Sequence, residues 1–245
     1  LAILATLYLI VILFEPTYTW IYTVAGLLTV IIGIFCRFHF PQFSETVEQR
    51  KELVFRKRYW LYYALTFLAG ARRQIFMVFA GFLLVQKFGF PLEKMVLLFL
   101  VNAGITVWIA PKLGLLVERI GERKALTLEY LGLIIIFLSY AVVESMNIAL
   151  VLYILDNVFF SISFAISTYF QKIADPADIA STAGISFTIN HIAAVLLPAL
   201  LGLIWIENHG AVFLIGASIA GASLILVRAI PDTPEIGKET YWTNN

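Results

Sequence analysis

The sequence predicts an all-α membrane protein with eight transmembrane helices. Hydrophobic residues make up 61% of the 245 residues, charged residues make up 13%, and the mean hydropathy is +0.90. A soluble domain contains about 45–50% apolar and about 25% charged residues. A water-soluble fold of this length could not bury so much apolar surface. The charged residues also cluster between long apolar segments, as they do in polytopic membrane proteins.

Two apolar segments precede a strongly polar stretch, and six follow it. The segments are residues 1–14, 18–36, 60–85, 95–117, 125–143, 149–170, 182–206 and 211–227. The first is short for a membrane span, which needs about 20 residues. We therefore interpret it as the tail of a truncated helix, and the chain as a fragment of a longer polytopic protein.

Lysine and arginine residues are concentrated in alternate loops. They occupy residues 37–59, the turn at 118–124, Lys172 and the stretch from Arg228 onward. In the loops on the other side, only Lys87 and Lys94 are basic. Basic loops stay in the cytoplasm, so this asymmetry predicts that the first group is cytoplasmic. Residues 37–59 suit an amphipathic linker on the membrane surface, either binding anionic lipid or forming a solvated loop that sets the topology.

The turn between segments 95–117 and 125–143 carries the most specific motif in the chain. It reads Gly114-Leu-Leu-Val-Glu118-Arg119-Ile-Gly121-Glu122-Arg123-Lys124. This pattern resembles the loop signature of the major facilitator superfamily of secondary transporters. In that family the signature lies on the cytoplasmic side, between the second and third helices of each six-helix half. The family most often has Asp at the position of Glu118 and a basic residue at the position of Glu122.

The resemblance implies a domain layout. Residues 1–36 would be the last two helices of an N-terminal bundle, and 37–59 the cytoplasmic linker. Residues 60–230 would be a six-helix C-terminal bundle of two inverted three-helix repeats, and 231–245 a cytoplasmic tail. The resemblance also implies that the turn gates the cytoplasmic side, with Glu118 meeting the helix start near Ser181 and Thr182. The alternative is that the turn only sets the topology. The gating residues would be Gly114, Glu118, Arg119, Gly121, Arg123 and Lys124.

Arg72 and Arg73 lie in the middle of segment 60–85. An arginine at the centre of a membrane helix costs about 2.5–3.5 kcal/mol, so each must face a wet cavity, an acid or an anionic ligand. Adjacent helical residues point about 100° apart, so the two need not face the same cavity. Glu129 lies one turn inside its segment, and we expect it to pair with Arg123 or Lys124.

Polar residues near the middle of other segments complete a candidate substrate pathway. Its members are Arg72, Arg73, Gln74, Asn102, Asp156, Asn157, Asn190 and His191. Asp156, Phe160, Ser163 and Ser167 follow helical spacing and form a mildly polar stripe. In one interpretation an arginine binds an anion, and Asp156 or His191 carries a proton. In the other, Asp156 pairs internally with an arginine, and the Asn and His side chains join helices. The two are compatible.

These observations predict a secondary active transporter of a small solute that works by alternating access. An organic anion is the favoured cargo and protons the favoured coupling ion. The alternatives are proton-coupled efflux of neutral or cationic compounds, and a non-transporting membrane sensor or structural protein. No enzyme activity, cofactor, metal or nucleic-acid partner is expected. The expected partners are the cargo, membrane lipids and a missing N-terminal half, in the inner membrane of a bacterium or archaeon.

Overall fold

The computed structural model describes residues 18–40, 53 and 55–241. The regular elements in these ranges are helices, apart from one isolated bridge between Glu235 and Lys238. Seven spans among the described residues are long and apolar enough to cross a membrane. The predicted segment 1–14 lies outside the described residues, so the count of eight spans stays a prediction.

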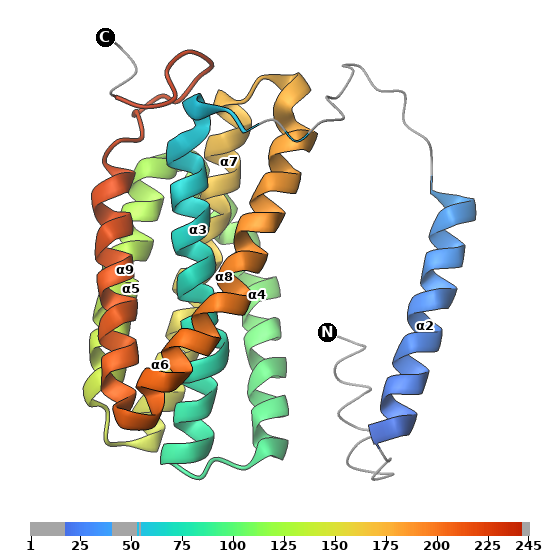
Figure 1. Cartoon of the computed structure of the whole chain (residues 1–245), viewed down its shortest axis with the longest axis vertical. Coiled ribbons are helices and arrows are strands. Elements are labelled where there is room, and N and C mark those ends of the chain that lie inside the picture. The colour runs from blue at the N-terminus through green and yellow to red at the C-terminus, as the bar shows by residue number, and fades with distance from the viewer. Residues whose placement is uncertain (1–17, 41–52, 54, 242–245) are drawn as a thin grey trace.

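The first described helix, α2 (Tyr18–His39), stands apart from the others in Figure 1. Its apolar side chains are exposed along its length, including Trp20 and Tyr22 near its start. So much exposed apolar surface requires lipid or further protein around the helix. The predicted amphipathic linker after α2 lies mostly outside the described residues, and its last part forms a short 3-10 turn, η1 (Lys57–Tyr59).

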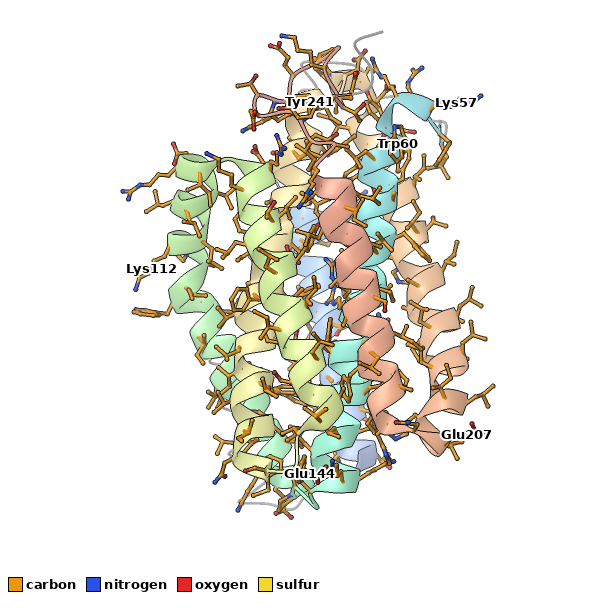
Figure 2. The ribbon with its side chains drawn as sticks, turned by 90° about the vertical axis from the view of Figure 1, so that its left-hand side faces the viewer. Lys57, Trp60, Lys112, Glu144, Glu207 and Tyr241 are labelled. Atoms are coloured by element: carbon orange, nitrogen blue, oxygen red, sulfur yellow. The ribbon has the colours of Figure 1, made fainter. Side chains whose placement is uncertain are left out.

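The other six spans form one bundle (Figures 1 and 2). The spans are α3 (Trp60–Gln74) with the π-helical turns η2 (Ile75–Ala80) and η3 (Leu83–Lys87), α4 (Leu92–Ile120), α5 (Glu122–Val142), α6 (Met146–Phe160) continued through η4 (Ser161–Ser163) into α7 (Phe164–Ile173), α8 (Ile179–Glu207) after the turn η5 (Pro176–Asp178), and α9 (His209–Val227). Each segment predicted from residue 60 onward lies within one of these spans, to within one residue.

Two glycines allow the chain to reverse between spans. Gly121 joins α4 to α5 with φ +82°, and its N–H donates to Val117 O at 2.9 Å. Gly89 adopts φ +64° in the turn between the first two spans of the bundle. Side chains with a Cβ rarely adopt this left-handed backbone region, so glycine suits both turns. Gly114 lies inside α4, with open space where a Cβ would stand.

The two ends of the bundle differ in their loops. Lys57, Trp60 and Tyr241 lie at one end, and Glu144 and Glu207 lie at the other (Figure 2). We call the first the signature end, because the turn at Gly121 lies there. Described parts of the basic loops that the sequence assigns to one side meet at this end, where Arg56 contacts Asp178, Lys172 contacts Glu122 and Arg123 contacts Asp232.

Buried apolar side chains form two clusters in the bundle. One lies at the signature end and includes Leu61, Leu126, Ile166 and Val227. The other lies toward the opposite end and includes Phe79, Phe137, Tyr153 and Phe213. In α3, α5, α6 and α9, the residues between the two clusters include buried polar side chains.

The segment after α9 folds back onto the signature end. Tyr241 N–H donates to Ala229 O at 3.0 Å, and the Tyr169 hydroxyl on α7 donates to Glu239 O. Glu239 and Thr240 are buried. The part of the predicted tail that the structure describes is therefore docked on the bundle.

Candidate functional site

Arg72 is the centre of a polar layer between the two apolar clusters. Its side chain is 0% exposed, at the last turn of α3. Its Nη1 donates to Ser223 Oγ on α9, and its Nη2 lies 3.2 Å from Glu129 Oε1 on α5. Its Cζ lies 4.4 Å from the centroid of the Tyr130 ring. Arg72 therefore ties three helices together. We call Arg72, Glu129, Asp156 and Ser223 the polar layer.

Asp156 belongs to the polar layer from α6, and its carboxylate has no hydrogen-bond partner among the described residues. Its side chain is 1% exposed, and neither carboxylate oxygen accepts a hydrogen bond from any residue that the structure describes. Glu129 Oε2 and Arg72 Nε are also unpaired within that part of the chain. If both carboxyl groups were ionised, the layer would hold more negative than positive charge. An uncompensated charge is costly in a buried site, and binding one proton removes it.

The partner of Glu129 differs from the one that the sequence predicts. The expected pair with Arg123 or Lys124 is wrong, because Glu129 is fully buried and its carboxylate faces Arg72. An internal ion pair of an arginine does exist, as one interpretation of the sequence expects. Its acid is Glu129 and not Asp156, because α5 places Glu129 beside the end of α3.

Arg73 points away from the polar layer and lines a cavity. The cavity has a volume of about 660 Å³ and lies between α3, α4, the α6–α7 span and α8. Arg73 is exposed, and the structure gives its side chain no hydrogen bond or ion pair with the residues that it describes. Among the described residues that line this main cavity, Arg73 is the only charged one. The turn of about 100° per helical residue thus separates the two arginines.

A side cavity of about 280 Å³ adjoins the main one, and Arg73 and Asn190 line both. Gln74 and His191 line the side cavity alone. His191 is exposed, and its Nδ1 lies 2.9 Å from the backbone oxygen of Phe187 in its own helix. Four of the predicted pathway residues, Arg73 among them, therefore line these two cavities.

Asn102 and Asn157 join α4 to α6. Asn157 Nδ2 donates to Thr106 Oγ1 at 2.9 Å and lies 3.4 Å from the backbone oxygen of Asn102. Thr106 Oγ1 donates to that same oxygen at 2.9 Å. Neither asparagine is among the described residues that line the two cavities. The Asn157 side chain thus acts as an interhelical hydrogen-bonding group, whereas Asn102 takes part through its backbone oxygen, and its buried Oδ1 accepts no hydrogen bond from the described residues.

Two residues of the signature turn pair with neighbouring segments. Glu122 is 3% exposed, and its Oε1 lies 2.6 Å from Lys172 Nζ near the end of α7. Arg123 Nη1 lies 3.1 Å from Asp232 Oδ1 and 3.1 Å from the Tyr241 hydroxyl. The hydrogen bond from Tyr241, with the charge of Arg123, holds the pKa of Asp232 below its usual value. Glu122, where the motif departs from the family pattern, is thus the buried acid of the turn.

Glu118, Arg119 and Lys124 are exposed at the same turn. The structure gives their side chains no hydrogen bond or ion pair with any residue that it describes. Ser181 and Thr182, where the expected latch would meet α8, are buried. The latch through Glu118 stays a prediction.

The residues before α3 clamp the start of α8. Arg56 Nε lies 2.5 Å from Asp178 Oδ2, and Arg58 Nη2 lies 3.3 Å from the same oxygen. The Tyr59 hydroxyl donates to Asp178 at 3.2 Å and accepts from Asp175 N–H at 3.0 Å. The hydrogen bond to Asp178 raises the pKa of Arg56 above its usual value. The clamp fixes the end of the linker to the helix that carries Asn190.

The described helices and the signature turn agree with a comparison against known protein families. The family model of the Major Facilitator Superfamily matches residues 1–198. The chain belongs to this superfamily. It is an integral, multi-pass membrane protein of a transporter family, as the signature turn predicts. No curated protein and no solved structure matches the chain.

Sequence reasoning missed several residues of the site in this superfamily member. Tyr62 and Thr66 line the main cavity from the first turns of α3, and no pattern in the sequence distinguishes them from packing residues. The ion pair between Arg72 and Glu129 could have been predicted from the sequence, because charged residues within membrane segments usually pair with one another. Ser163 and Ser167 belong to the predicted polar stripe, and both line the main cavity.

Proposed function

We propose that this superfamily member is a secondary active transporter that carries a small organic anion by alternating access, with proton coupling. The observation that carries the proposal is Arg73. It holds a fixed positive charge at the middle of a membrane span, faces a cavity and has no partner among the described residues. A negative cargo would supply the missing partner.

The chemistry of Arg73 favours a carboxylate or phosphate. Its planar guanidinium can donate parallel hydrogen bonds to two oxygens of one anionic group. A cationic cargo is disfavoured, because it would meet the single positive charge of the main cavity without an opposing acid among the described lining residues. Hydrogen bonds to charged groups contribute about 1.5–3 kcal/mol each.

The polar layer supports proton coupling. It holds Asp156 and Glu129 against Arg72 alone, and both oxygens of Asp156 are buried without a donor in the described part of the chain. A proton on Asp156 would balance the layer at neutral pH, and its loss would bias the packing of α6 against α3 and α5. His191 is the second candidate carrier, because it lines the side cavity beside Arg73.

The remaining parts of the proposal follow from the family layout. Residues 1–36 would belong to an N-terminal bundle that supplies the other wall of the cavity, and 60–230 would form two inverted repeats. The signature end would face the cytoplasm of a bacterium or archaeon, since its loops carry the excess of Lys and Arg. Gly114, Glu118 and the rest of the turn would then gate that side as the bundles rock.

The experiment is anion uptake into proteoliposomes that hold the full chain with its N-terminal bundle. Arg73→Gln should lower uptake about ten- to a hundredfold, the equivalent of about 1.5–3 kcal/mol. Arg228→Gln is the matched control, because Arg228 is exposed after α9 and is not among the residues that line the two cavities. If the Arg73→Gln variant transports every anionic compound as well as the unaltered protein does, Arg73 does not bind the anion.

Proton coupling has a separate test. With Asp156→Asn, uptake driven by a pH gradient should be lost, whereas exchange of cargo without a gradient should continue. The Asn side chain is neutral and of similar size, so the fold should tolerate it. If gradient-driven uptake survives both Asp156→Asn and His191→Gln, neither residue carries the proton.

A further inference from the structure

The polar groups of the main cavity fall into two sets, and the first set is already paired. Ser186 Oγ lies 2.9 Å from the Tyr62 hydroxyl, and Ser161 Oγ donates to Asn157 O at 2.7 Å. Thr106 bonds to α4 and α6, as described above. These groups stabilise the walls and have less capacity left for a ligand.

The second set is unpaired. Arg73 on α3, Asn190 on α8, Ser163 in η4 and Ser167 on α7 all line the main cavity. The structure gives these four side chains no hydrogen bond with any residue that it describes. They come from three different spans of the bundle, so they can surround a molecule in the cavity.

Aromatic side chains form much of the remaining wall. Phe160, Phe164 and Phe187 line the cavity on the α6–α7 and α8 sides. The faces of such rings pack against the C–H surface of a ligand, and the hydroxyl and amide groups between them can meet its polar edges. A wall of this kind suits a cargo that is polar along its length and not only at one end.

The charge of the wall limits the charge of the cargo. Arg73 is the single ionic group among the described lining residues, and it balances one negative charge. A second negative charge on the cargo would stay uncompensated at membrane depth, which is costly.

From these observations we infer that the cargo is a polyhydroxylated monocarboxylate, of the kind formed by oxidising one carbon of a sugar to an acid. Its carboxylate would bind Arg73, and its hydroxyl groups would bind Asn190, Ser163 and Ser167. An unsubstituted fatty acid would leave these groups without partners, and such a loss discriminates strongly against the wrong ligand. This inference rests on the proposed function, since it names the class of anion that the same cavity carries.

The test compares gluconate with hexanoate, which have the same number of carbon atoms and one carboxylate each. Both are offered as competitors and as labelled cargo to proteoliposomes holding the full chain, at several concentrations. Gluconate should bind and be transported at least about tenfold better than hexanoate, because missing polar partners cost a factor of this size or more. The double variant Ser163→Ala/Ser167→Ala should lower the binding and transport of gluconate and so remove most of that preference.

Ser139→Ala is the matched control, since Ser139 on α5 is partly exposed, lies outside both cavities and donates to Ile135 O in its own helix at 2.8 Å. Equal or better use of hexanoate by the unaltered protein would overturn the inference, whatever the serine variants do. If Arg73→Gln still abolishes transport of hexanoate in that case, the anion site stands and only the hydroxylated class is wrong. If Arg73→Gln has no effect on any carboxylate, the proposed function fails as well.

Discussion

Arg72 and Arg73 are adjacent on α3, and their surroundings are opposite. Arg72 is 0% exposed and is held by Glu129 and Ser223, whereas Arg73 faces a cavity and has no partner in the described chain. Each would cost about 2.5–3.5 kcal/mol at the centre of a lipid-exposed helix. The bundle relieves this cost in one case with a buried acid and in the other with an open cavity.

The difference between the two environments suggests that adjacent residues of one helix have different roles, one in stability and one in function. A buried, paired arginine fixes the distances between α3, α5 and α9, because its donors reach side chains of both other helices. An unpaired arginine on a cavity wall contributes little to that packing but can bind a ligand. The polar layer is thus expected to hold the bundle together, and the cavity wall to recognise cargo.

The largest expected effect comes from removing the guanidinium of the polar layer. Arg72→Met should lower the free energy of unfolding by about 3–5 kcal/mol, because it breaks a buried ion pair and leaves buried acids without a cation. Thermal unfolding in detergent should show a Tm lower by about 6–20 °C. Arg73→Met, the same change one residue later, should alter the free energy of unfolding by no more than about 0.5 kcal/mol.

A double variant sharpens the same comparison. Arg72→Met combined with Glu129→Leu should recover much of the lost Tm, since a well-packed apolar pair can replace a buried ion pair. Equal destabilisation by Arg72→Met and Arg73→Met would contradict the separation of the two environments.

Two glycines, one on α5 and one on α4, test how tightly each helix is packed, with a smaller expected effect. A Cβ at Gly132 on α5 would stand 2.3 Å from the Phe159 ring, whereas one at Gly104 on α4 would meet nothing within 4 Å. Gly132→Ala should therefore cost about 1–3 kcal/mol of unfolding free energy through overpacking. Gly104→Ala should be neutral or stabilise by up to about 1 kcal/mol, because Ala favours helix over Gly. The same thermal unfolding measurement decides, and similar Tm shifts for both would show that α5 and α4 are equally packed.

Parts of this arrangement are readable from the sequence. Long apolar segments predict the six spans of the bundle, and the glycine in the charged turn predicts the reversal at Gly121, because these features depend on local composition and backbone freedom. Helical geometry alone also predicts that Arg72 and Arg73 point in different directions. These properties need no knowledge of which helices pack together.

The partners of these residues depend on contacts between distant segments. Arg72 and Glu129 are 57 residues apart, and Arg123 and Asp232 are 109 apart. A helix end can place an acid toward a loop or into the bundle, and only the packing of α5 and of α3 against α9 decides which. The π-helical turns after Gln74 cannot be predicted from the sequence either, since the apolar sequence there is compatible with an α-helix.

The smallest expected effect concerns the docked segment after α9, which contrasts with the polar layer because its ion pairs are exposed. The hydrogen bond from the Tyr241 hydroxyl, at 2.7 Å, and the charge of Arg123 hold the pKa of Asp232 below its usual value. A lowered pKa means that ionised Asp232 favours docking, so its contribution is present at neutral pH and is lost as the pH falls below about 4. Hydrogen exchange at the Tyr241 amide, which bonds to Ala229 O, should therefore speed up in that range after correction for intrinsic rates.

Asp232→Asn should produce the faster exchange of the Tyr241 amide already at neutral pH, and should leave the unfolding of the bundle almost unchanged, since exposed ion pairs contribute little to stability. Glu235→Gln is the control on the same segment, because Glu235 pairs only with the exposed Lys238 in the described chain. If the Tyr241 amide exchanges at the same rate in Asp232→Asn and in Glu235→Gln, the contact between Asp232 and the signature turn does not hold the segment in place. Docking would then depend on the buried residues Glu239 and Thr240 and on the Tyr169 hydroxyl.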